Sequence, residues 1–414
     1  MTGNPAAPSG SRPTPTRDAT SLREWASVIA VALSAFAFVT TEFLPVGLLP
    51  QIAADFGIRP GAAGLMVTAP GIIAALSAPG MVLLAGRMDR RYVFLLLTSC
   101  LLASNVICAV AHGLSVLLVG RALLGASLGG FWTLATAAST RLVNPKDTAR
   151  AMAIILAGVT CATVIGVPIG TYIASIASWR AAFASTAALA AVALLGQLML
   201  VPSLPSHVAL KVRDLTRVAR QPHVSKALLL IPLVFGAHFF SYTYITPFLL
   251  GHAHFAMSSV IWLLLGFGII GFVSNIVLSA SITHNLKRTM MLVVTLLLCA
   301  LLGLPLLSHS HIGVATLLMV WGAAFGGIPL CCSVWMQRAT PDDPEAGSAL
   351  LVCIVQVAIA IGSSVGGAVV DHLGIPANFA LASALAFAGL LTLRGANVGA
   401  YDAHKALAPE FSKV

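Results

Sequence analysis

Long apolar runs separated by short polar segments occupy most of the chain. The runs are long enough to cross a bilayer, which takes about 20 residues of helix. Because they are continuously apolar rather than alternating, helices are favoured over barrel strands. The pattern predicts an all-α membrane protein with 12 transmembrane helices in two six-helix halves. The predicted spans lie near 25–50, 61–84, 93–111, 115–138, 150–174, 180–201, 227–250, 258–281, 289–308, 312–336, 347–370 and 377–394.

Composition supports this prediction. Of the 414 residues, 58% are hydrophobic and only 9% are charged, whereas a soluble domain carries about 25% charged residues. This balance argues against a water-soluble enzyme and a disordered protein. The formal net charge is +10, but the basic residues are scattered in short loops and form no aromatic-interleaved patch, so we expect no nucleic-acid partner. The seven cysteines lie inside apolar runs, and we expect neither a metal nor a cofactor.

The distribution of Lys and Arg predicts the orientation. Of 23 basic residues, 20 fall in segments that share one side when both termini face the cytoplasm, as the positive-inside rule requires. We therefore expect a multi-pass protein of the inner (plasma) membrane. The expected organisation is a disordered cytoplasmic tail (1–24), an N-terminal half (25–201), a basic cytoplasmic linker along the lipid headgroups (202–226), a C-terminal half (227–394) and a cytoplasmic tail (395–414).

An internal repeat joins the two halves. At an offset of 197 residues, Gly129-Gly130 falls on Gly326-Gly327 and Arg90-Arg91 falls on Lys287-Arg288. Near the first span the offset drifts to 202, where Pro45 matches Pro247. Two related six-span halves are typical of a secondary transporter whose substrate site lies near the midplane, between the halves.

Two charged residues lie inside predicted spans. Glu42 is the one acidic residue well inside a span, one turn before Pro45, and Arg121 is the one basic residue there. A carboxylate in hydrocarbon is costly and indicates function by default. Both residues fall at similar depth, so they can pair directly or through water. The pair either couples transport to protons or forms a static ion pair that fixes helix packing.

Several uncharged polar and aromatic residues in spans are candidates for substrate binding. Trp132 shares a helix face with Arg121 and either stacks on a planar ligand or belongs to the core. In the seventh span, His238, Ser241 and Tyr242 share a face. His238 can donate, accept and titrate, so it joins the proton-coupling candidates, with a packing role as the alternative. The other candidates, equally open to a packing role, are Asn275 and Gln356.

The fifth span contains small residues and a proline, in the string VIGVPIG. Gly166, Pro168 and Gly170 make a thin, bendable helix that suits a gate. The same residues also serve any tightly packed pair of spans.

The chain resembles the major facilitator superfamily over about 25–394, and within it the twelve-span drug:proton antiporters. GRALLGASLGG is similar to that family's arginine motif, with Arg121 in the arginine's place, and GVPIG to its antiporter motif. GRMDRRYV is similar to its inner-loop signature, although Gly86 stands where an aspartate is usual and Asp89 where a glycine is usual. The resemblance assigns gating roles in this loop to Arg87, Asp89, Arg90 and Arg91.

Within that family, TTEFLPVGLLPQIAADFGI and YTYITPF are similar to bacterial sugar and purine ribonucleoside efflux transporters. DRRYV, GASLGGFW and WGAAFGG favour the purine ribonucleoside branch, whereas His238 matches the sugar branch in place of an expected glutamine.

The resemblance implies alternating access and proton-driven export of small polar metabolites, with purine ribonucleosides such as inosine and guanosine favoured. A sugar (arabinose-type) exporter and a broad drug exporter are the alternatives. A non-transporting membrane sensor is a remote one, because the longest loop has about 25 residues. The expected partners are the substrate, protons and the lipid bilayer. We expect a monomer that is not an enzyme, since neither GxSxG nor HExxH occurs.

Overall fold

The computed structural model describes residues 20–85, 88–204, 212–341 and 343–394. All regular structure in these ranges is helical, and 12 helices or helix pairs are long and apolar enough to cross a membrane. The predicted fold class is therefore confirmed. Most of both predicted tails, Arg87, and residues 205–211 of the predicted linker lie outside the described residues.

The described residues of the N-terminal half form six spans, four of which are single helices. In the second span α2 continues into α3, and in the fifth a π-helix, η2, separates α6 from α7. A short 3₁₀ turn, η1 (Pro145–Asp147), precedes α6. The helices are α1 (Leu22–Phe56), α2 (Pro60–Ala63), α3 (Leu65–Ala85), α4 (Arg90–Ala109), α5 (Leu114–Leu142), α6 (Thr148–Cys161), η2 (Ala162–Gly166), α7 (Val167–Ile176) and α8 (Trp179–Leu200).

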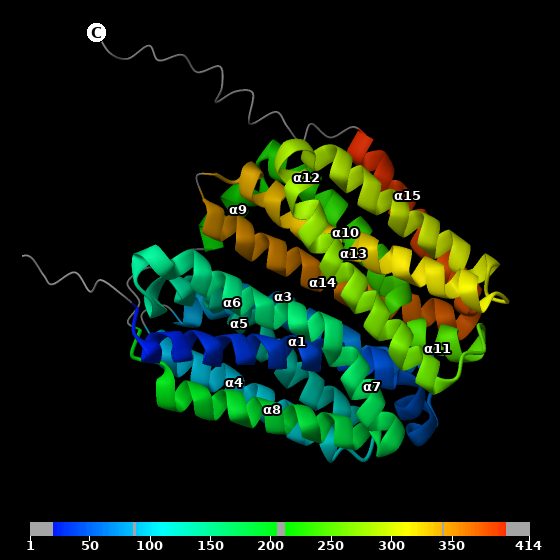
Figure 1. Ribbon diagram of the computed structural model, residues 1–414, viewed down its shortest axis with the longest axis horizontal. Coiled ribbons are helices and arrows are strands. Elements are labelled where there is room, and N and C mark those ends of the chain that lie inside the picture. Colours follow the sequence, from blue (N-terminus) through cyan, green and yellow to red (C-terminus); the bar gives the residue numbers. More distant parts are fainter. Residues whose placement is uncertain (1–19, 86–87, 205–211, 342, 395–414) are drawn as a thin grey trace, which may run out of the picture.

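The C-terminal half follows a short linker helix, α9 (Val212–Ala219). Its first span is formed by α10 and α11, and the long helix α12 holds two spans that are separated by a kink at Asn285 (φ −151°, ψ 64°). The helices are α10 (Pro222–Tyr242), α11 (Ile245–Gly251), α12 (Met257–Leu306), α13 (His311–Ala339), α14 (Pro344–Leu373) and α15 (Ile375–Arg394). Figure 1 shows the two halves side by side.

The central helix α1 has a well-defined start and end. Ser21 and Glu24 form a capping box, which satisfies backbone N–H groups of the first turn. The helix therefore begins at Leu22, three residues before the predicted boundary at 25. It ends at Phe56 and is capped by Gly57, whose left-handed backbone (φ 61°) is the conformation that glycine adopts at low cost.

The internal repeat is visible in the packing of the spans. A β-carbon on Gly125 of α5 would lie 2.8 Å from the Cα of Pro70 in α3. One on Gly322 of α13 would lie 3.1 Å from the Cα of Phe267 in α12. Both pairs are related by the offset of 197 residues found in the sequence. Glycine thus allows the same close helix approach at equivalent places in the two halves.

The two halves contact each other chiefly through α14, which packs against α2, α3 and α5, through α12, which packs against η2 and α7, and through α1, which packs against α11. Three hydrogen bonds cross this junction near the end of the bundle that carries α11, at the right in Figure 1. The backbone N–H of Gly61 donates to Asp371 at 2.7 Å, and the hydroxyls of Thr68 and Ser363 lie 2.9 Å apart. The hydroxyl of Thr246 donates to a carbonyl of α1. The junction is therefore hydrogen-bonded at this end.

Candidate functional site

Arg121 is completely buried in the N-terminal half. Its guanidinium donates to three backbone carbonyls: Nη1 to Thr41 at 2.7 Å, Nη2 to Glu42 at 2.8 Å and Nε to Met66 at 2.6 Å. A buried cation is costly unless its donors are satisfied, and here backbone oxygens satisfy them.

Proline explains why two of these carbonyls are free to accept. Thr41 lies four residues before Pro45, and Met66 lies four residues before Pro70. In a helix the carbonyl of residue i−4 accepts from the N–H of residue i, which proline lacks. Arg121 therefore replaces the missing hydrogen bonds of α1 and α3 and holds two interrupted helices together.

The same arrangement recurs where the halves meet. Val46 lies four residues before Pro50, and its carbonyl accepts a hydrogen bond at 2.8 Å from Thr246 of the other half. In α3, the carbonyl of Ala75, four residues before another proline, lies 3.5 Å from the thiol of Cys353. Carbonyls freed by proline thus act as acceptors for neighbouring helices, including helices across the junction.

Glu42 is buried, and its carboxylate joins the two halves. Oε1 accepts a hydrogen bond at 3.0 Å from Nε2 of Gln356 in α14, and the side chains are 5% and 4% exposed. The amide oxygen of Gln356, Oε1, has no hydrogen-bond partner among the described residues. The structure places Arg121 beside Glu42, as expected from their depth, but Arg121 contacts the backbone carbonyl, while the carboxylate bonds to Gln356.

A cavity of about 200 Å³ lies between α1, the fifth span, α10, α12 and α13, and its wall includes Phe43, the residue after Glu42, but not Glu42 itself. Phe43 lies on its wall and stacks on Phe239 across the junction, with ring centroids 5.6 Å apart. Most of the wall is apolar or aromatic, with a few polar groups, as is usual in ligand sites. The wall residues are Phe43, Val159, Thr160, Thr163, Val167, His238, Phe239, Tyr242, Phe267, Gly268, Gly271, Phe272, Asn275, Gly322, Phe325, Gly326 and Pro329.

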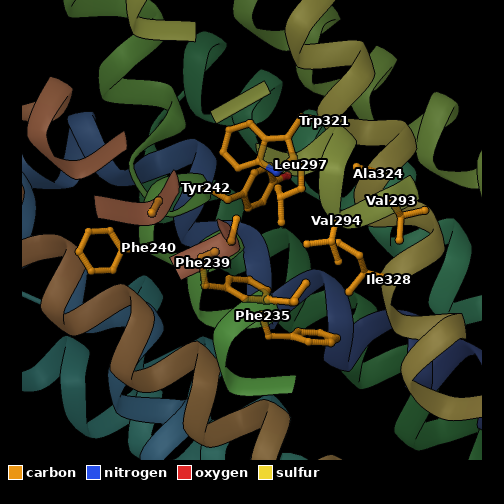
Figure 2. Packing of buried hydrophobic residues seen from close by; sticks show 14 of the residues in the cluster. Phe235, Phe239, Phe240, Tyr242, Val293, Val294, Leu297, Trp321, Ala324 and Ile328 are labelled. Carbon is orange, nitrogen blue, oxygen red and sulfur yellow. The ribbon is translucent and has the colours of Figure 1, made fainter. Parts of the chain in front are cut away.

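His238 lies on the cavity wall within a cluster of aromatic rings. Its Nδ1 lies 3.0 Å from Nε1 of Trp321, and its ring stacks on Phe325 with centroids 3.4 Å apart and on Tyr242 at 4.7 Å. Figure 2 shows Trp321 and Tyr242 next to each other in this cluster. Nε2 of His238 has no hydrogen-bond partner among the described residues.

The structure brings some of the predicted substrate-binding residues together. Tyr242 and Asn275 lie on the cavity wall, and Asn275 also donates to the carbonyl of Gly326 at 2.9 Å. Ser241 is buried away from the cavity and donates to Asn378 at 2.9 Å. Trp132 is half-buried in the core of the N-terminal half, 5.9 Å from the ring of Phe131, and the cavity wall does not include it.

The gating candidates of the fifth span surround its π-helix. Gly166 ends the π-helix and Pro168 lies in the first turn of α7. A β-carbon on Gly166 would lie 2.9 Å from the hydroxyl of Thr40, and Gly170 similarly faces Leu44, so small residues let this span approach α1. A β-carbon on Gly268 of α12 would lie 2.7 Å from the Cα of Val164. The irregular turn therefore lies where both halves meet, and such turns are frequent at functional sites.

The described part of the inner-loop motif is bound to its own half. Asp89 caps α4: Oδ1 accepts from the N–H of Arg91 at 2.8 Å and of Leu204 at 2.7 Å, and Oδ2 accepts from Ser203. Burial raises the pKa of Asp89, but these hydrogen bonds and the nearby Arg91 charge lower it more, so the net pKa falls below its usual value.

The two arginines of this motif contact the same segment. The backbone N–H of Arg90 donates to the carbonyl of Leu204 at 3.0 Å. Nη2 of Arg91 donates to the carbonyl of Leu198 near the end of α8, at 2.8 Å. The motif thereby anchors the segment that leads out of the N-terminal half.

Sequence reasoning missed the aromatic partners of the cavity. Trp321 and Phe325 lie four residues apart on α13, in the string WGAAF, so they share one helix face. This four-residue spacing of two aromatic residues was the feature of the sequence that could have predicted the cluster. Phe267 of α12 was missed as well, and it stacks on Tyr242 at 5.0 Å.

Comparisons with known proteins agree with this architecture. The family model described as "Major Facilitator Superfamily" matches residues 31–352. The fold is similar to that of the human organic anion transporter MFSD10 (TETRAN), with a TM-score of 0.67 and 19% identity, covering 90% of this chain and 99% of that one.

Two bacterial relatives are similar over most of their length. The purine ribonucleoside efflux pump NepI of Salmonella typhimurium is 32% identical over 361 residues, which cover 87% of this chain and 91% of that protein. The transcription regulatory protein OpdE of Pseudomonas aeruginosa is 34% identical over 376 residues, or 89% and 93% of the two chains. Together with the family model and the twelve spans, these matches establish that the chain belongs to the Major Facilitator Superfamily.

Proposed function

We propose that the protein is a proton-driven antiporter that exports purine ribonucleosides such as inosine and guanosine by alternating access. The observation that carries the proposal is the Glu42–Gln356 hydrogen bond, which links the two halves one residue along α1 from Phe43, a wall residue of the aromatic cavity. A titratable group that lies at the junction, and whose neighbour along the helix lines a ligand-sized space, can respond to both protons and substrate.

The amide of Gln356 can serve both forms of Glu42. The carboxylate accepts from Nε2, as observed. The neutral acid instead offers an O–H, and Oε1 of Gln356, which has no partner among the described residues, is an acceptor for it. We propose that a proton and the substrate exclude each other here, and that release of the proton to the cytoplasm resets the carrier. Arg121 keeps the Glu42 segment in place through its carbonyl bonds.

The cavity supports a flat, partly aromatic substrate. Stacked rings on its wall offer faces for a base, while Asn275 and His238 supply polar groups. The name of the NepI relatives points to the same substrate class. A sugar or broad drug exporter is the alternative. The proposal includes a location in the inner membrane with both termini cytoplasmic, function as a monomer, no enzymatic activity, and gating by the fifth span and the Asp89–Arg91 loop.

The test uses the purified protein in liposomes loaded with labelled inosine under an imposed pH gradient. We expect gradient-driven inosine movement in the wild type and its loss in Glu42→Gln. The matched control is Glu24→Gln, which removes a carboxylate from the first turn of the same helix and keeps a residue suited to the capping box. Full gradient-driven transport by Glu42→Gln would reject Glu42 as the proton carrier.

Competition identifies the substrate class. Unlabelled guanosine should reduce inosine movement, whereas arabinose and a tetracycline should not. Transport of arabinose or of the tetracycline, with no inosine movement by folded wild-type protein, would replace the nucleoside proposal by the corresponding alternative.

A further inference from the structure

The hydrogen bond between Trp321 and His238 determines where the imidazole carries its proton. The indole Nε1–H is a donor and has no acceptor capacity. Since it lies 3.0 Å from Nδ1 of His238, Nδ1 must present its lone pair. The ring proton of the neutral imidazole is therefore on Nε2.

The surroundings favour this neutral form. A second proton would have to bind at Nδ1, where it would face the indole N–H and break the hydrogen bond. The ring is completely buried and contacts five aromatic rings of α10, α12 and α13, of which only the phenol of Tyr242 can ionise. The other four rings are Phe239, Phe267, Trp321 and Phe325.

Nε2 is the remaining polar atom of the ring, and it has no hydrogen-bond partner among the described residues. A buried donor without an acceptor is costly, and His238 lies on the cavity wall. We propose that His238 is a neutral hydrogen-bond donor that selects transported molecules with an acceptor, a carbonyl oxygen or a ring nitrogen, on a flat ring, and that it carries no proton during transport. This inference rests on the proposed function, because it takes the cavity as the substrate site.

Two substitutions separate the two nitrogens. Asparagine places an amide oxygen near the position of Nδ1, so His238→Asn keeps an acceptor for Trp321 and removes the Nε2 donor. Glutamine reaches the position of Nε2, so His238→Gln keeps a donor towards the cavity and removes the acceptor of Trp321.

The first measurement requires no substrate. The protein is labelled with ¹⁵N-histidine, and the His238 signals are identified by their loss in His238→Asn. We expect the Nε2–H tautomer, unchanged between about pH 5 and pH 8. A proton on Nδ1, or a doubly protonated ring within that range, would overturn the proposal whatever the substrate is.

The second measurement is inosine binding and gradient-driven transport in the same liposomes. We expect His238→Asn to weaken inosine binding about tenfold, His238→Gln to retain most of it, and both variants to remain dependent on the pH gradient. Equal binding by His238→Asn and wild type, or loss of gradient dependence in both variants, would contradict the proposal. Failure of the wild type to bind inosine would reject the nucleoside substrate, and the tautomer measurement would still decide the role of His238.

Discussion

The two halves share one helix arrangement but differ in the chemistry at their centres. At the offset of 197 residues, the position of Arg121 is occupied in the C-terminal half by Leu318, which is also completely buried. At the offset of 202, the position of Glu42 is occupied by Tyr244, whose hydroxyl donates to the carbonyl of Ser363 at 2.7 Å. One half therefore contains a buried charge centre, and the other contains neutral polar and aromatic groups.

This difference shows that one repeated helix arrangement can hold two different kinds of polar centre. The N-terminal centre bonds its cation to carbonyls that proline has freed. The C-terminal centre surrounds one histidine with rings and gives it an indole partner. The cavity wall includes rings of the aromatic centre and Phe43, the residue after Glu42, so a molecule bound there contacts the aromatic centre.

The largest effect is expected when the N-terminal half receives the residue that the C-terminal half has at the equivalent position. Arg121→Leu leaves the two carbonyls that proline has freed without a donor, at about 1–3 kcal/mol each. We expect a loss of several kcal/mol in the free energy of unfolding and a large fall in the yield of folded protein. Thermal unfolding of the purified protein measures the loss of stability.

Restoring the helix bonds provides the control. Pro45→Ala and Pro70→Ala return N–H groups to α1 and α3, so the triple variant with Arg121→Leu should recover part of the lost stability. A triple variant no more stable than Arg121→Leu alone would show that Arg121 does not act through these carbonyls.

A milder change tests the aromatic half. Trp321→Phe preserves a large ring and removes the indole donor, so Nδ1 of His238 becomes free to accept a proton. We expect inosine binding to weaken severalfold, because the ring proton can then move from Nε2 to Nδ1, and to become dependent on pH as the ring becomes protonated on acidification. Binding measured at several pH values, with Trp262→Phe at an exposed position as the control, checks this. Binding independent of pH would mean that Trp321 does not fix the state of His238.

The smallest expected effect lies outside both centres. Asp89→Ala removes the cap of α4 and should lower the free energy of unfolding by about 1 kcal/mol, whereas Asp89→Asn keeps a capping residue and should cost less. Because the folded-state pKa of Asp89 is lowered, its charge stabilises the protein above its usual pKa of 3.8, and this contribution is lost as the pH falls through the lower value. Unfolding of the three proteins in denaturant at neutral and acid pH measures both effects. An Asp89→Ala protein as stable as the wild type at neutral pH would contradict the capping role.

The hydropathy pattern was sufficient for the twelve spans, and the glycine spacing for the repeat, because both follow from helix length and close packing. The pattern does not give the rotation of one helix against another. Trp132 and Arg121 do share a helix face, yet Trp132 packs in the core while Arg121 reaches carbonyls of two other helices.

The hydrogen-bond partner of Glu42 could not be predicted from the sequence, for the same reason. Gln356 lies 314 residues later, in the other half, and only the packing of the halves brings the two side chains together. The carbonyls that Arg121 binds were more accessible to prediction, since two of them lie four residues before a proline.

The carbonyl of Val46 has a consequence for motion. Because Pro50 offers it no N–H, this oxygen depends on Thr246 of the other half. Any movement that separates α1 from α11 removes that donor, and hydrocarbon cannot replace it. Water must then hydrate the carbonyl, so separation of the helices and wetting of the gap at this end of the molecule are one event.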